Sequence, residues 1–254
     1  MSKTDGNRQR RRFMILQTGT LPDNPGGMRG LYGDMAELFF PPLGFPPEQV
    51  VVTRLHEHRL PAGEPGDYSG ILITGSPLMV SAQEDWMLRI RPWLERARAE
   101  GVPLLGVCFG HQLLACAFGG HVGASPGGLE AGTVSAEFSA ERAEDPLFSV
   151  LPASAPVQVH HYESVIVPPA GAEIVGWSAH DEHHALRYGP ACWGVQFHPE
   201  LTAPMMRTLL QEEVASLQAA ELDPLSVLDR VRNTPVGPTL LRRFREIAER
   251  RHAE

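Results

Sequence analysis

Short apolar runs alternate with helical patterns along the first 120 residues of this chain, and this alternation restricts the possible folds more than any other feature. The expected strands span residues 13–16, 50–53, 71–74 and 102–107. A long amphipathic helix is expected between the last two, because apolar side chains recur at three- and four-residue spacings until Gly101. Further helices are expected over residues 33–40, ended by a Pro-Pro pair, and over residues 111–118. Strands joined by helices predict a mostly parallel sheet that is covered on both faces.

The pattern changes after Gly120. Strand-like runs follow at residues 133–138, 157–161, 164–167, 173–177, 184–187 and 192–197. Most of their connections are too short for crossover helices, so some of these strands should pair antiparallel. Helices return over residues 205–217 and 225–231, followed by a last apolar stripe. We expect one domain over residues 13–254, preceded by a basic, disordered tail over residues 1–12.

Composition and charge exclude several classes of protein. The formal net charge of -8 argues against a general binder of nucleic acid or of anionic membranes. Three cysteines in 254 residues do not make a disulfide framework. Neither a secretory signal nor an apolar stretch of roughly 18–20 residues is visible. These features predict a cytoplasmic protein.

Residues 106–110 read GVCFG and place a thiol between two glycines, directly after an expected strand and before an expected helix. Small residues on both sides permit a sharp turn that lifts Cys108 out of the core, as in a nucleophile elbow. The turn also places Cys108 at a helix N-terminus, where the helix dipole favours a thiolate. The alternative is a buried, inert cysteine in a strand–helix corner, and this stretch alone leaves both interpretations open.

The segment "CWGVQFHPE" supplies partners for such a thiol. In an extended chain residues two apart point the same way, so His198 and Glu200 are expected to project together. A base oriented by a carboxylate and paired with a thiol elsewhere in the sequence is the general logic of a catalytic triad. Ligands in open parallel sheets sit beyond the carboxyl ends of the strands, so Gly75 and Ser76 should face the same crevice as Cys108.

"GVCFGHQLLACAFGG" together with "WGVQFHPE" resembles the class I glutamine amidotransferase family of the Cys-His-Glu type, and "LITGSP" resembles its oxyanion strand. The resemblance extends from about Phe13 to the end of the His198 loop. It implies a flavodoxin-like, three-layer α/β/α sandwich with a central, mainly parallel sheet and some antiparallel strands.

The resemblance implies a role for each triad residue. Cys108 corresponds to the nucleophile, His198 to its base and later the acid for the leaving amine, and Glu200 to the group that orients His198. The implied chemistry is attack on a γ-glutamyl amide, a thioester intermediate, and hydrolysis, with no metal or organic cofactor.

Further positions correspond to oxyanion and substrate contacts. The backbone N–H of Phe109 is implied as one oxyanion donor. The second is implied in the turn at Gly75 and Ser76, where Ser76 replaces a glycine that many members carry. Gln112 corresponds to a position that helps to hold the glutamyl group.

The loop "HHYESV" lies where enzymes of the GMP-synthetase type carry Ser-His-Gly-Asp. His161 and Glu163 match the His and Asp of that pattern in kind, and we take both, with Tyr162, as candidate substrate-binding residues. Tyr162 replaces a glycine. It either narrows the mouth of the site or packs as a rim aromatic on its own loop.

"LQTG", "GDM", "EDWM" and "FGHQ" are similar to a stand-alone subgroup that resembles the glutaminase part of GMP synthetase and includes plant γ-glutamyl peptidases. We therefore expect a stand-alone hydrolase of a small γ-glutamyl substrate. One alternative is a glutaminase subunit that delivers ammonia to a separate ATP-dependent synthetase, since the chain has no Walker-type loop. The other is a non-enzymatic thiol that serves redox sensing or binding.

Other chemistry-bearing residues are expected to be structural. The histidine clusters at residues 56–58 and 180–184 lack a recognised ligand spacing, so exposed loop histidines are expected and no metal site. Cys116 and Cys192 are expected in the core, and so are Trp86 and Trp93, which share a helix face. The Gly- and Pro-rich residues 22–29 are a candidate mobile loop near the crevice.

Overall fold

The computed structural model describes residues 11–253, with side chains described as far as Arg251. Its strands are β1 (Arg12–Gln17), β2 (Val50–Arg54), β3 (Tyr68–Ile73), β4 (Leu104–Val107), β5 (His121–Ala124), β6 (Glu130–Phe138), β7 (Ser154–His161), β8 (Glu163–Val167), β9 (Glu173–Ser178), β10 (Ala185–Gly189) and β11 (Cys192–Val195). Its α-helices are α1 (Met28–Tyr32), α2 (Phe40–Leu43), α3 (Asp85–Ala99), α4 (Phe109–Ala117), α5 (Ala203–Glu212), α6 (Val214–Ala219), α7 (Pro224–Asp229) and α8 (Val236–Ala253).

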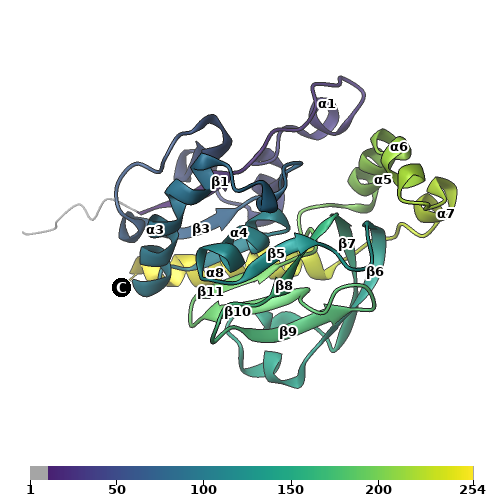
Figure 1. Ribbon diagram of the computed structural model, residues 1–254. Helices are drawn as coiled ribbons and strands as arrows, with labels where there is room; N and C mark the ends of the chain where they lie inside the picture. Colours follow the sequence, from purple (N-terminus) through teal and green to yellow (C-terminus); the bar gives the residue numbers. More distant parts are fainter. Residues whose placement is uncertain (1–10, 254) are drawn as a thin grey trace, which may run out of the picture.

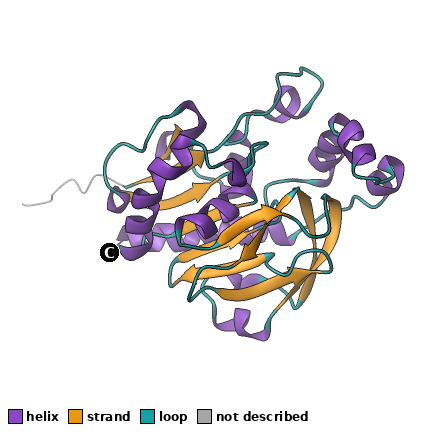
Figure 2. Ribbon diagram, in the orientation of Figure 1, coloured by secondary structure: helices purple, strands orange, loops and turns teal. Residues whose placement is uncertain are grey.

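Nine strands form one mixed sheet in the order β2-β1-β3-β4-β11-β10-β9-β6-β7 (Figure 2). The pairs from β2 to β11 are parallel, and the pairs from β11 to β7 are antiparallel. The change of direction follows from the connections, because helices link the first strands whereas short loops link most of the later ones. The parallel pairing of the first strands and the antiparallel pairing among the later ones were both expected, and both are confirmed. β5 and β8 form a separate two-stranded sheet.

Side chains alternate along the parallel strands between two apolar cores. In β1, Phe13 and Ile15 join the core beneath α2 and α8, whereas Met14 and Leu16 join the core beneath α3 and α4. Figure 1 shows α8 behind the sheet and α3 and α4 in front of it. Helices on both faces of a mainly parallel sheet make the predicted three-layer α/β/α arrangement.

A third apolar cluster joins segments from the two ends of the chain. Leu21, Met28 and Leu38 pack there with side chains of α5 and α6 such as Met206, Leu210 and Leu217. In Figure 1 α5, α6 and α7 form a group beyond the ends of β6 and β7, and α1 lies above β1. This cluster brings α1 and α5 together over the carboxyl ends of the parallel strands.

Two expectations for local structure were wrong, and one strand had not been expected. Residues 33–40 do not form one helix: the pair Pro41–Pro42 opens α2 instead of ending a helix, since proline suits the first helical turn. The expected helix over residues 205–217 is divided into α5 and α6 at Glu213. β5 was not foreseen, because its four residues include a glycine and show no clear alternation.

Residues 1–10, which hold most of the expected basic tail, lie outside the described residues. The division into a tail over residues 1–12 and one domain over residues 13–254 therefore stays a prediction. Within residues 11–253, no helix is both long enough and apolar enough to cross a membrane.

Candidate active site

Cys108 occupies the sharp turn between β4 and α4. Its backbone has φ 49° and ψ -105°, a conformation that non-glycine residues rarely adopt and that surrounding structure must hold in place. The Cys108 N–H donates to the Val195 carbonyl of β11 at 2.8 Å, and the Gly110 N–H donates to the Thr74 carbonyl after β3 at 3.1 Å. Three neighbouring strands therefore fix the position of the thiol.

The two glycines that flank Cys108 are required by close backbone contacts. A Cβ on Gly106 would lie 2.4 Å from the Gly110 carbonyl oxygen, and a Cβ on Gly110 would lie 2.5 Å from the Ile73 carbonyl oxygen. Neither backbone atom can move away as the end of a side chain can. The pattern GVCFG thus reflects the turn itself, as the sequence predicted.

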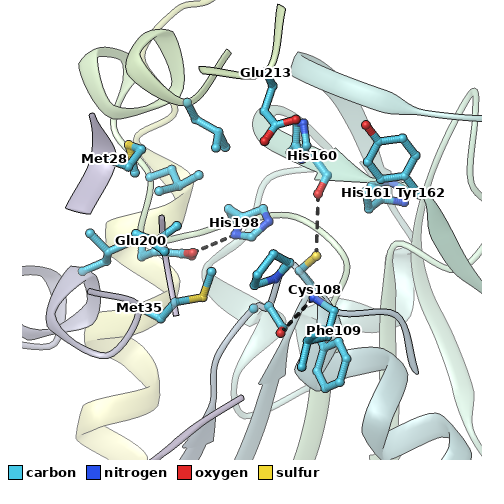
Figure 3. Close-up of a pocket in the computed structure, with 18 of the residues that line it drawn as sticks. Met28, Met35, Cys108, Phe109, His160, His161, Tyr162, His198, Glu200 and Glu213 are labelled. Carbon is cyan, nitrogen blue, oxygen red and sulfur yellow. Dashed lines mark hydrogen bonds and ion pairs between the residues drawn. The ribbon is translucent and has the colours of Figure 1, made fainter. Parts of the chain in front are cut away.

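His198 and Glu200 lie in the loop that follows β11, which ends at Val195 and is therefore shorter than the expected run to residue 197. His198 Nδ1 and Glu200 Oε1 are 2.7 Å apart, and the His198 N–H donates to the Gln158 carbonyl at 2.8 Å. Their side chains are 12% and 3% exposed. Figure 3 shows the His198 ring between Glu200 and the Cys108 sulfur.

Opposing effects act on the pKa of His198. Burial lowers it, whereas the negative charge of Glu200 and the Cys108 sulfur hydrogen-bonded to the ring raise it, and the result lies well above the ordinary value of 6.5. The site thus favours an imidazolium next to the sulfur. A cation in this place stabilises a thiolate, which is the nucleophilic form of cysteine.

Gln196 also contacts the thiol, although it was not among the residues expected at the site. Its Nε2 donates to Cys108 Sγ at 3.5 Å, and its Oε1 accepts a 3.0 Å hydrogen bond from Gln112 Nε2. A second hydrogen bond from Gln112 Nε2 reaches the Glu163 carbonyl at 2.6 Å. The signal was the short spacing, because Gln196 precedes His198 by only two residues.

The expected oxyanion donors lie around the same sulfur. Phe109 is the first residue of α4, where N–H groups have no acceptor within the helix. A Cβ on Gly75 would lie 3.0 Å from His198 Cε1 and 3.8 Å from Cys108 Cβ, so this backbone borders the reacting groups. Ser76 has no positive φ, and its hydroxyl donates to the Thr18 carbonyl at 3.0 Å.

The three expected substrate-binding residues after β7 have different surroundings. The His161 ring is buried: Nδ1 faces the Glu163 carbonyl at 3.0 Å and Nε2 faces Glu130 Oε2 at 2.9 Å. Tyr162 packs on the third apolar cluster and meets the His160 ring edge to face. The Glu163 carboxylate accepts a hydrogen bond from the Ser81 N–H at 3.2 Å. All three line the cavity described below.

Glu130 forms a buried polar cluster that the sequence did not reveal. Its carboxylate receives His161 and His184 at 2.9 and 3.0 Å and the Ser178 hydroxyl at 2.9 Å, and these contacts hold its pKa below the usual range despite burial. Of the histidines over residues 180–184, His184 is buried and His180 and His183 are half-buried, so the expectation of exposed loop histidines was wrong for this segment. The ligand atoms of Glu130, His161 and His184 lie within 4.8 Å of one another, which also suits a metal ion.

Cys108 is 5% exposed and lines the cavity described below, whereas the other two cysteines do not line it. Cys192 is 1% exposed in β11 and Cys116 is half-buried on α4. Burial raises the pKa of both thiols, so both stay protonated at neutral pH. The core positions of Trp86 and Trp93 are confirmed, and Trp86 stacks on Phe109 with ring centroids 5.8 Å apart.

A cavity of about 270 Å³ opens above Cys108. Its floor contains Cys108, Phe109, Gln112 and the Gly75–Ser76 turn. Its walls come from residues 160–163, the segment with α1, and α5 and α6 (Figure 3). The Gly- and Pro-rich residues 22–29 reach the crevice as expected, because Pro22 and Met28 line it.

His160 is expected to make the protein less stable in acid. Burial lowers its pKa from 6.5 to about 4, and its Nε2 has no hydrogen-bond partner among residues 11–253. Between these pH values the unfolded chain binds a proton that the folded chain does not, so the free energy of unfolding falls as the pH falls, by up to about 1.4 kcal/mol per pH unit. His111, whose pKa burial lowers to about 3, acts in the same direction.

Urea unfolding of His160→Gln at pH 8, 6.5, 5 and 4 checks this expectation. At pH 8 the difference from the unaltered protein reports lost packing alone, because His160 is neutral in both states. The difference in the free energy of unfolding between the two proteins should shrink, or change sign, as the pH falls to 4. A difference that stays constant over this range would contradict the expectation.

Comparisons with known proteins agree with this geometry. The family model described as glutamine amidotransferase class-I matches residues 47–215. Gamma-glutamyl peptidase 5 of Arabidopsis thaliana is 26% identical over 220 residues, which are 85% of this chain and 86% of that protein. A glutamine-hydrolysing GMP synthase subunit of Ignicoccus hospitalis is 33% identical over 149 residues, which are 58% of this chain and 74% of that protein.

Solved structures of similar fold cover nearly the whole chain. A glutamine amidotransferase from Methylobacillus flagellatus has a TM-score of 0.70 and 26% identity, over 96% of this chain and 94% of that one. A glutamine amidotransferase from Thermotoga maritima has the same TM-score of 0.70 at 19% identity, over 96% and 99% of the two chains, and shows the shared fold.

Proposed function

Because this chain belongs to the class I glutamine amidotransferase family, we propose that it hydrolyses the amide bond of a small γ-glutamyl compound through a thioester on Cys108. The observation that supports this most is the meeting of the Cys108 thiol with an imidazole, His198, which the Glu200 carboxylate orients at 2.7 Å. A thiol paired with an oriented base is the arrangement of nucleophilic acyl transfer.

In the first half-reaction the Cys108 thiolate attacks the γ-carbonyl carbon and forms a C–S bond. Negative charge develops on the carbonyl oxygen, where the Phe109 N–H and the backbone of the Gly75–Ser76 turn are the proposed donors. The C–N bond then breaks, and the leaving amine takes its proton from the His198 imidazolium. A γ-glutamyl thioester and a free amine result.

In the second half-reaction His198, now neutral, accepts a proton from water, which attacks the thioester carbon. The C–S bond breaks, glutamate leaves, and the proton on His198 again faces a Cys108 thiolate. Glu200 stabilises the imidazolium in both halves without accepting its proton. Hydrogen bonds through Gln196 and Gln112 connect the Cys108 sulfur to the Glu163 backbone. No step of the proposed reaction calls for a metal or an organic cofactor.

A second candidate function is supply of ammonia to a separate ATP-dependent synthetase. It rests on the similarity to the Ignicoccus hospitalis protein, which is named as one subunit of a glutamine-hydrolysing GMP synthase. In this case the chain hydrolyses glutamine slowly alone and much faster with its partner. The triad chemistry is the same in both candidates.

Incubation of the isolated chain with glutamine and a panel of γ-glutamyl amides tests the proposal. We expect release of glutamate, and a mass increase of one γ-glutamyl group on Cys108 after acid quenching. Turnover that is strong without a partner supports the stand-alone hydrolase, whereas turnover that needs a co-purifying synthetase supports the second candidate. A thiol that is readily oxidised but never acylated would contradict both and leave the redox alternative.

A further inference from the structure

We propose that the amine released by this enzyme has an apolar body and carries no carboxylate, so that γ-glutamyl amides of decarboxylated amines are preferred over γ-glutamyl dipeptides. This inference rests on the proposed function and names its substrate class. It is carried by the composition of the cavity wall on the side of His198.

The leaving amine must depart on the side of His198, because His198 gives it a proton. Gln112 and Glu163, the expected glutamyl contacts, are linked to the Cys108 sulfur through Gln196 and not through His198, because Gln112 Nε2 donates to the Glu163 carbonyl and to Gln196 Oε1. Figure 3 shows Met28 and Met35 on the Glu200 side of His198, away from Cys108. The cavity therefore has one end for the glutamyl group and another for the amine.

The amine end is lined by aliphatic and thioether side chains. Those that reach the cavity are Leu21, Met28, Met35, Leu38, Leu201 and Leu209. They belong to or border the third apolar cluster, which packs α1 against α5. Apolar surface of this kind binds an apolar group by removing it from water, and methionine adapts to its shape.

Among residues 11–253, no lysine or arginine lines the cavity. The charged side chains that line the cavity are carboxylates, Glu163, Glu200, Glu212 and Glu213, apart from the His198 imidazolium, which loses its charge as the amine takes its proton. The pKa of His160, which burial lowers to about 4, keeps that ring neutral at pH 7. A carboxylate on the leaving group would therefore enter an apolar, negatively charged space without a lasting counter-ion.

Two of these carboxylates, Glu212 and Glu213, have different surroundings in the cavity wall. Glu212 is fixed in the wall: its Oε2 accepts a hydrogen bond from the Met28 N–H at 3.0 Å and its Oε1 accepts one from Asn24 Nδ2 at 2.9 Å. Glu213 lies at the junction of α5 and α6, where it accepts a hydrogen bond from the Ser216 hydroxyl, and it stands near His160 (Figure 3). Because Glu213 lines the cavity, and both Glu213 and His198 act on the His160 ring, we assign the repulsion of an anionic leaving group to Glu213.

Matched substrates that differ by one carboxylate test the inference. γ-Glutamylphenethylamine and γ-glutamylphenylalanine share the glutamyl group and the aromatic ring, and γ-glutamylisoamylamine and γ-glutamylleucine form an aliphatic pair. We expect kcat/KM to favour the amide without the carboxylate in each pair, on the order of 10²-fold at pH 7.5. Equal values, or a preference for the dipeptides, would overturn the inference.

Variants of residues in the cavity wall test which side chains set the preference for amides without a carboxylate on the leaving amine. Glu213→Lys should narrow the ratio of kcat/KM values within each pair, because it adds a cation to the cavity wall, and Glu213→Gln should narrow it less. Glu95→Gln, on the exposed face of α3, is the matched control and should leave the ratio as it is. Met35→Ala should lower kcat/KM more for γ-glutamylphenethylamine than for glutamine, whose leaving group is ammonia. A Glu213→Lys variant with unchanged ratios would contradict the role of Glu213.

The outcome also separates this inference from the function on which it rests. If Cys108 is acylated but dipeptides are preferred, the inference about the leaving amine is wrong, while the proposed hydrolase function still stands. Absence of acylation with glutamine and with all four conjugates rejects the hydrolase and, with it, the assignment.

Discussion

Replacement of Cys108 by alanine is expected to lower kcat/KM for γ-glutamyl amide hydrolysis by about 10⁴-fold or more, since no other group at the site can form the acyl intermediate. The variant should fold normally, because alanine fits the space and leaves the strained turn to the same backbone hydrogen bonds. Glutamate release measures the loss, and mass spectrometry should find no acylated protein.

Cys116→Ala is the matched control for this prediction. Cys116 is half-buried on the same helix, its thiol is kept protonated by burial, and it does not line the cavity. We expect this variant to keep its activity and its acylation on Cys108. Full activity of Cys108→Ala would show that the triad has been assigned wrongly.

Replacement of His198 by asparagine should lower kcat/KM by about 10³-fold or more, because the variant loses both the general acid and the general base. It should also change the thiol. The His198 imidazolium, whose pKa lies well above the ordinary value of 6.5, stabilises a thiolate, and asparagine carries no charge. At pH 7, iodoacetamide should therefore alkylate Cys108 more slowly in the variant than in the unaltered protein.

His121→Asn serves as the control for His198→Asn, because His121 is exposed on β5, away from the cavity. Its hydrolysis and alkylation rates should match those of the unaltered protein. If Cys108 is alkylated at pH 7 at the same rate in His198→Asn as in the unaltered protein, the imidazole does not activate the thiol, and His198 would have another role.

The sequence predicted the parts of the site that depend on local rules. The turn at Cys108 needs small residues at fixed positions on either side, and this requirement is visible in GVCFG because glycine has few substitutes in such contacts. His198 and Glu200 are only two residues apart, so their side chains can meet, although they do so in the loop after β11 and not in the expected strand. The alternation of strands and helices likewise predicted the mainly parallel half of the sheet.

Other features depend on pairing between distant strands and could not be predicted in this way. Glu130 meets His161 because β6 pairs with β7, and it meets His184 because the chain returns to the sheet at β10. No local spacing relates these residues. Similarly, Glu212 closes the amine end of the cavity by binding the Met28 N–H, which is distant in the sequence.

The thiol and the wall of the amine end are held by separate parts of the chain. β3, β4 and β11 fix the sulfur through backbone hydrogen bonds, whereas α1 and α5 supply much of the wall through side chains. A wall built from side chains can be altered one residue at a time, while a reacting atom held by backbone stays in place. This arrangement makes the scaffold evolvable: descendants of one such gene can acquire new amines as substrates by point substitutions and inherit the same chemistry.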